Sequence, residues 1–167
     1  AERDCSPEFF QTEFERLADM DSPQERGRDF DYFIGLLFQQ LPDVEVRVGS
    51  SGTIGEVDIH MICTDSPPWL YRLVGTHTLI ENKWESEPIE TSEISKFHTK
   101  ASDRAGCERA YFISMSGFTT GRRKQTGAVT EIRKCSNPDL VDLWDDDVED
   151  MVEDGTPERV LRERHLS

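Results

Sequence analysis

Strand-like and helix-like segments alternate along the chain from residue 44 onward, and this alternation limits the folds that are open to it. Residues 44–48 alternate between apolar and charged side chains, as a half-buried strand does, and the Gly- and Ser-rich stretch 49–55 predicts a hairpin into a second strand. Strands that alternate with helices after such a hairpin predict an α/β fold, with a mixed β-sheet core flanked by α-helices. The further elements are expected to be strands at 78–83, 110–115 and 139–144 and helices at 91–104, 119–134 and 145–153.

Two helices are predicted before the sheet. Ser6 and Pro7 begin the first helix, in which apolar residues recur at helical spacing. The string S-P-Q-E at 22–25 is a capping box with Pro at the first helical position, and it opens a second helix to about Gln40. The stretch 64–71, with its Pro-Pro-Trp string, predicts a loop or a wide hairpin.

Three charged residues fall on two neighbouring strands of this scheme. The string G-E-V-D-I-H places Asp58 on one strand, and L-I-E-N-K-W places Glu81 and Lys83 on the next, where residues two apart point to the same face. Two carboxylates can hold a hard cation such as Mg²⁺ through oxygen, and an ammonium group can orient an attacking water and offset charge on a phosphate. The pattern is therefore the one that a metal-dependent phosphodiesterase needs.

The pair of Glu81 and Lys83 also has an ordinary explanation. With 18 Glu and 5 Lys in the chain, chance gives about 0.5 E-x-K strings, so the pair could be the solvated face of a strand. The setting favours a site, because the apolar residues before Glu81 lead into a buried strand, where unpaired charges are costly. Glu56 and His60 share a face with Asp58, and they are either further members of the site or polar residues that border it.

The composition excludes several classes of protein. The four cysteines, at 5, 63, 107 and 135, include no C-x-x-C string, which favours reduced thiols over a zinc site. The sequence shows neither a signal peptide nor a long apolar run, which predicts a cytoplasmic protein without membrane insertion. The chain begins with Ala rather than Met, so we expect it to be processed or to be part of a longer protein. We expect a single domain at 1–154 and a C-terminal tail at 155–167 that is either a short helix or frayed.

The net charge of −15 is the main argument against a nucleic-acid enzyme, because an acidic surface repels a phosphate backbone. The charge is unevenly distributed, however: residues 51–134, which carry the candidate site, are neutral, and the acidic excess lies at 1–50 and 135–167. Each cluster of basic residues in the neutral segment is a candidate nucleic-acid contact or a solvated helix face. The two clusters are Lys96, Lys100 and Arg104, and Arg122, Arg123 and Lys124.

Three successive strings carry a resemblance to a known family. They are L-I-E-N-K-W-E-S-E-P-I, E-I-S-K-F-H-T-K-A and R-A-Y-F-I-S-M-S-G-F-T-T. Together with Q-E-R-G-R-D-F-D-Y-F-I-G-L-L-F upstream and L-V-D-L-W-D-D-D-V-E-D-M downstream, they resemble the catalytic domain of Mrr-like restriction endonucleases, in the PD-(D/E)xK nuclease superfamily. The resemblance covers roughly residues 24–153. It implies a restriction-endonuclease-like fold and a metal-dependent endonuclease.

The resemblance also assigns roles to individual residues. It implies that Asp58 and Glu81 are metal ligands, that the backbone carbonyl of Asn82 is a further ligand, and that Lys83 is the catalytic lysine. Mg²⁺ would be the cofactor, Mn²⁺ would substitute for it, and the substrate would be DNA, cut to leave a 5′-phosphate. Asp31 stands where many relatives carry a Glu that reaches the metal, and because its side chain is shorter we leave it outside the core site.

Two other kinds of function stay open. The chain could be a nuclease-fold module that binds nucleic acid or a partner without cutting. It could also be a protein-interaction module whose acidic ends dock a basic partner or mimic DNA, for which the helix at 145–153 would be essential. No target-reading element is left once the core is assigned, so specificity is expected to come from a targeting domain, a partner protein or a homo-oligomer. A role in restriction and defence against foreign DNA is implied only at the level of the family.

Overall fold

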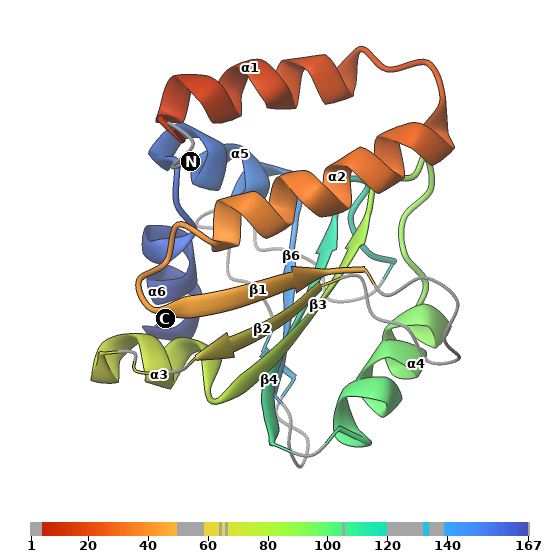
Figure 1. Cartoon of the computed structure of the whole chain (residues 1–167). Coiled ribbons are helices and arrows are strands. Elements are labelled where there is room, and N and C mark those ends of the chain that lie inside the picture. The colour runs from red at the N-terminus through yellow and green to blue at the C-terminus, as the bar shows by residue number, and fades with distance from the viewer. Residues whose placement is uncertain are drawn as a thin grey trace.

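The structure, a computed structural model, describes residues 5–49, 59–63, 65, 67–104, 106–119, 132–133 and 139–166. These residues form a six-stranded mixed sheet with helices on both faces, which confirms the predicted α/β fold (Figure 1). The strands are β1 (Val44–Val48), β2 (Ile59–Cys63), β3 (His77–Lys83), β4 (Cys107–Ser114), β5 (Ile132–Arg133) and β6 (Asp139–Leu143). The helices are α1 (Pro7–Ala18), α2 (Pro23–Phe38), α3 (Pro68–Val74), α4 (Thr91–Ser102), α5 (Asp145–Asp154) and α6 (Glu158–Leu166).

The sheet combines an antiparallel part with a parallel part, in the strand order β1-β2-β3-β4-β6-β5. β1, β2 and β3 are antiparallel neighbours, whereas β3, β4 and β6 run parallel to one another. Parallel neighbours need a crossover connection, and α4 supplies the one between β3 and β4. The sheet is therefore of the mixed type that a hairpin followed by alternating helices and strands predicts.

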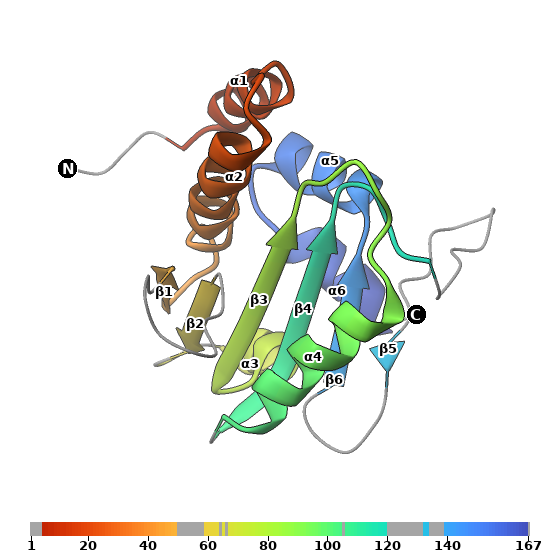
Figure 2. The same ribbon diagram turned by 90° about the vertical axis from the view of Figure 1, so that its right-hand side faces the viewer.

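The sheet separates two apolar layers, because successive side chains of a strand point to opposite faces. In β3, Leu79 belongs to the layer under α4 and Ile80 to the larger layer that the other five described helices form, and both side chains are fully buried. Figure 2 shows α4 in front of the sheet, α3, α5 and α6 behind it, and α1 and α2 next to the edge that β1 and β2 form. β3 is thus covered on both faces. None of the described helices has the length and hydropathy of a membrane span.

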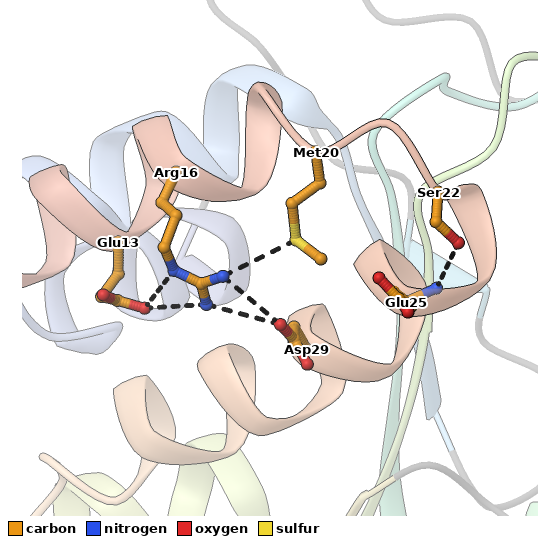
Figure 3. Close-up of polar contacts among 6 residues, drawn as sticks. All are labelled: Glu13, Arg16, Met20, Ser22, Glu25 and Asp29. Atoms are coloured by element: carbon orange, nitrogen blue, oxygen red, sulfur yellow. Dashed lines mark hydrogen bonds and ion pairs between the residues drawn. The ribbon is translucent and has the colours of Figure 1, made fainter.

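The two N-terminal helices form where the sequence predicts them, each after a Ser-Pro string. Ser22 Oγ accepts a hydrogen bond from the backbone N–H of Glu25 at 3.3 Å, which caps the start of α2 (Figure 3). Arg16 of α1 forms an ion pair with Asp29 of α2 at 3.4 Å. Because this pair is exposed, it contributes little, and the packing of phenylalanine rings between the two helices provides most of the attraction.

The prediction of a loop or wide hairpin at 64–71 is wrong, because α3 occupies Pro68–Val74. Pro68 takes the first helical position, where the missing N–H of proline removes no hydrogen bond. Leu70 and Leu73 follow at helical spacing and are buried in the larger apolar layer. A Pro-Pro string therefore marks the start of a helix here rather than a loop.

Two other boundaries differ from the expected ones. β4 begins at Cys107, three residues before the expected start. Most of the helix expected at 119–134 lies outside the described residues, but its end is wrong, because Ile132 and Arg133 form β5 and pair with β6. The strands at 44–48 and 139–143 and the helices at 91–102 and 145–154 agree with the predicted elements within a few residues.

The segment after Gly155, for which a short helix or a frayed end was expected, contains α6, and a buried ion pair joins this helix to α5. Asp147 is completely buried and accepts a hydrogen bond from the backbone N–H of Trp144 at 2.8 Å, which caps α5. Arg164 Nε of α6 donates to Asp147 Oδ1 at 2.8 Å. Val160 of α6 is fully buried in the larger layer.

Removing the cationic partner of this pair should destabilise the protein strongly. Arg164→Ala leaves the Asp147 carboxylate buried without its counter-charge, which costs about 3–5 kcal/mol of the free energy of unfolding. Chemical denaturation measures this difference. The matched control is Arg159→Ala, because Arg159 pairs with Asp154 and Glu163 on the surface and its loss costs about 1 kcal/mol or less. Equal losses in the two variants would contradict this assignment.

Candidate active site

The structure brings Glu81 and Lys83 together at the C-terminal end of β3. Strand alternation places both residues on the face of β3 that carries Leu79. Lys83 Nζ lies 3.9 Å from Glu81 Oε1, and the side chains of Lys83 and Glu81 are 35% and 12% exposed. The carboxylate is therefore largely withdrawn from water, while the ammonium group beside it can still be reached from solvent.

Asp58 lies outside the described residues, as does Glu56, so the structure does not place the third predicted member of the site. The neighbouring backbone is described, however. Ile59, which follows Asp58 in the sequence, is paired across the sheet with Ile80, which precedes Glu81. The chain therefore begins β2 next to the strand segment that carries Glu81, and the prediction that Asp58 joins the site remains a prediction.

Asn82 points to the other face of β3, toward α2. Its side chain is 5% exposed, and its Nδ2 donates a hydrogen bond to Asp31 Oδ1 at 3.5 Å. The side-chain amide is thus bonded to the helix rather than directed to the face of Glu81. Any role of Asn82 as a ligand would use its backbone carbonyl, as the sequence analysis expects.

A cleft of about 590 Å³ opens beside Lys83, between the first half of α2 and the segment that leaves β3. We call it the α2 cleft. Figure 1 shows the start of α2 next to this segment. Its walls are α2 residues between Pro23 and Asp31 on one side and the consecutive residues 82–87 on the other. Among the pockets found in the described part of the chain, this one contains Lys83.

The α2 cleft contains two arginines, Arg26 and Arg28, that the sequence analysis did not select. They lie on the helix that also carries Asp31, and Arg28 and Asp31 are three residues apart, so helical spacing places them on one face. The spacing of Arg28 and Asp31 can be seen in the sequence. The sequence does not show that this face of α2 borders the end of β3, so the spacing alone could not assign the two residues to the site.

His60 lies on β2 opposite Leu79, two residues from Glu81 along β3, and its imidazole packs edge-on against that of His77. The ring centroids are 5.0 Å apart. Burial lowers the pKa of His60 below its ordinary value, and the nearby charges of His77, Arg104 and Arg47 lower it further. His60 is therefore neutral near pH 7 and positioned beside the candidate site.

Two of the four predicted nucleic-acid contacts can be located. Lys96 is exposed and Lys100 half-buried on α4, the helix that covers the Leu79 face of the sheet. Arg122 and Arg123 lie outside the described residues. Because α4 buries Ile94 and Phe97 against the sheet, the lysines are left on its remaining surface.

No preformed metal centre is found in the described part of the chain, where no group of three or more His, Cys, Asp or Glu side chains is arranged to hold an ion. This result does not include Asp58. The carboxylate of Glu81 and, on the α2 side, that of Asp31 are among the oxygen donors that the structure places at this end of the sheet. Cys5 and Cys107 are free thiols.

The environment of His60 predicts how stability changes with pH. Because the unfolded chain binds the His60 proton more readily than the folded chain, the free energy of unfolding should fall as the pH drops through 6.5 toward the folded pKa. In denaturant titrations, the free energy of unfolding of His60→Gln should therefore fall less between about pH 8 and about pH 5 than that of the parent protein. An NMR titration that puts the pKa of His60 at or above 6.5 would contradict this account.

The comparisons with known proteins fit the geometry. A family model described as restriction endonuclease, Mrr_cat, matches residues 23–144, from the start of α2 to the end of β6. No curated protein and no solved structure gives a significant match to the chain. The matched residues contain α2, β3 and both Glu81 and Lys83. The chain belongs to the Mrr_cat family of restriction endonucleases.

Proposed function

We propose that this protein is a metal-dependent endonuclease that hydrolyses phosphodiester bonds of DNA. Its family establishes a restriction-type nuclease in general terms. The observation that supports the specific chemistry is the pair at the end of β3, in which a carboxylate that is 12% exposed lies 3.9 Å from an ammonium group. A strand that is buried on both faces does not carry such a pair at random, because charges near a core are costly unless they serve each other or a ligand.

The donor groups of this site suit a hard divalent cation. The carboxylate of Glu81, the carboxylate of Asp58 and the backbone carbonyl of Asn82 are all oxygen donors, which Mg²⁺ prefers and Mn²⁺ accepts. We propose that these three residues hold the ion. A divalent cation bound there would polarise the phosphate and lower the pKa of the attacking water. Asp31 would act from the α2 side through its hydrogen bond to Asn82.

Lys83 is the group that we expect to act on the water and the phosphate. The register of β3 places its ammonium group 3.9 Å from the Glu81 carboxylate, and its 35% exposure leaves it accessible to substrate. It would orient the water or help to remove its proton, and it would offset the negative charge that develops on phosphorus. The water oxygen loses a proton and bonds to phosphorus as the bond to O3′ breaks, and O3′ takes up a proton from solvent, which leaves a 5′-phosphate and a 3′-hydroxyl group.

Substrate binding is proposed to use the basic groups of the neutral segment. Lys96 and Lys100 of α4, together with Arg122 and Arg123, would contact DNA phosphates, while the acidic ends of the chain would limit non-specific binding. Target selection would come from a targeting domain, a partner protein or a homo-oligomer. The proposed setting is the cytoplasm, in restriction of foreign DNA.

The alternative of an acidic interaction module receives less support. The helix α5 that would dock a partner uses Asp147 internally, as a cap and as the counter-charge of Arg164. Val148 and Met151 of the same helix are fully buried. α5 is therefore part of the core, and its acidic residues are in part structural. A module that keeps the fold but binds DNA without cutting it is the alternative that an activity assay must exclude.

Lys83→Ala should abolish most of the cutting. Purified protein incubated with supercoiled plasmid and with single-stranded DNA is expected to cut in Mg²⁺ or Mn²⁺ and not in EDTA. Loss of the ammonium should slow cutting by about 10²-fold or more, because a group that offsets charge in the transition state is removed. The control is Arg72→Ala, which removes an exposed cation on α3.

The fold of Lys83→Ala is checked by its thermal unfolding, so that lost activity is not mistaken for lost structure. Cutting that survives in Lys83→Ala would reject Lys83 as the catalytic lysine. Failure of the parent protein to cut any form of DNA, with its fold and metal binding intact, would reject the proposed endonuclease.

A further inference from the structure

The α2 cleft shares Lys83 with the candidate active site and therefore borders the place where the scissile phosphate would lie. Its volume of about 590 Å³ falls within the range of small-molecule sites, and it is large enough for one nucleotide. The cleft is open at the surface, so it can be reached from solvent. Its composition shows which chemical group it would favour.

Arg26 forms part of the cleft wall in a fixed orientation. Its guanidinium lies over the ring of Trp84, with Cζ 5.2 Å from the ring centroid. Trp84 is in turn packed against Phe30 at 5.2 Å and Phe14 at 5.5 Å between centroids, so the platform under the guanidinium is rigid. Arg26 Nε is buried and has no hydrogen-bond partner among the described residues. A guanidinium held on the wall of a cleft matches a phosphate, which can accept from the guanidinium fork in two places.

The two walls of the α2 cleft carry different sets of charged residues. The α2 wall carries Arg26 and exposed Arg28, and its one carboxylate, Asp31, is hydrogen-bonded to Asn82. The opposite wall carries exposed Glu85 and Glu87, together with Lys83 at the end of β3. An anion that enters the cleft is therefore attracted to the α2 arginines and to Lys83 and is repelled by the two glutamates beyond Lys83.

We propose that the α2 cleft binds the nucleotide next to the scissile phosphate on the cleaved DNA strand, with Arg26 and Arg28 in contact with its phosphate. This inference rests on the proposed endonuclease function, because Lys83 links the two sites. The carboxylates of Glu85 and Glu87 keep the phosphate on the α2 wall. Two arginines on one wall thus let a protein with a net charge of −15 hold a DNA strand beside its catalytic lysine.

Arg28→Ala tests the inference without disturbing the core, because Arg28 is exposed. Binding of a labelled DNA strand is measured by fluorescence anisotropy in EDTA, so that no cutting occurs. Affinity should fall about three- to tenfold, and the slope of log affinity against log salt should decrease by about 0.7 to 0.9, as one phosphate contact is lost. Glu87→Gln should bind more tightly, because it removes a repulsive charge. Arg72→Ala, the matched control on α3, should leave both affinity and slope unchanged.

A second experiment measures nucleotide binding in the α2 cleft independently of catalysis. A 5′-phosphorylated dinucleotide is titrated into the protein while the indole N–H signal of Trp84, identified with Trp84→Phe, is followed by NMR. The signal should shift in the parent protein and shift less in Arg28→Ala.

If the parent protein cuts DNA while Arg28→Ala binds DNA and shifts the Trp84 signal like the parent, the inference about the cleft is overturned and the proposed endonuclease stands. If the dinucleotide shifts Trp84 but no DNA is cut, the endonuclease fails and the cleft remains a nucleotide site. If the Trp84 signal does not shift in the parent protein, the inference that the cleft binds a nucleotide is overturned.

Discussion

The candidate site depends on the burial of β3 between two apolar layers. Leu79 and Ile80 are fully buried on opposite faces of the strand, so its register is fixed by both layers at once. A slip by one residue would turn Glu81 toward α2 and Asn82 toward α4. The same constraint therefore keeps Glu81 and Lys83 on one face and directs the amide of Asn82 to the helix. The positions of the charged groups follow from apolar packing, and no attraction between the charges is needed to explain them.

Local periodicity accounts for what the sequence predicted well. The capping box at 22–25 gives the start of α2, the alternation at 44–48 gives β1, and period-2 geometry gives the shared face of Glu81 and Lys83. The features that the sequence could not predict depend on which helices and strands pack against each other. The helix α3 was missed because two prolines also mark loops, and only the burial of its leucines decides for a helix. Arg28 was missed because its role depends on how α2 lies against the end of β3.

The acidic composition becomes easier to understand once the charges are placed. Some acidic residues are used within the fold, as Asp147 is by Arg164 and by the start of α5. Described basic residues lie on the α2 wall of the cleft that contains Lys83, and others lie on α4, which covers the face of the sheet that carries Glu81. For binding, the local arrangement of charge around a substrate path matters more than the total. The net charge of −15 therefore does not exclude a DNA substrate, and it implies that binding is sensitive to salt.

The central claim is that the start of β2 and the end of β3 form one metal site. Its most direct test is the location of Mn²⁺ by NMR, because this ion broadens the signals of nearby nuclei. At low Mn²⁺ concentration the amide signals of Ile59 and of residues 80–83 should broaden first, and those of His77, at the other end of β3, should stay sharp. Broadening confined to residues 145–147, at the acidic start of α5, would contradict this proposal, since it would show that the ion binds there and not at Glu81 and Lys83.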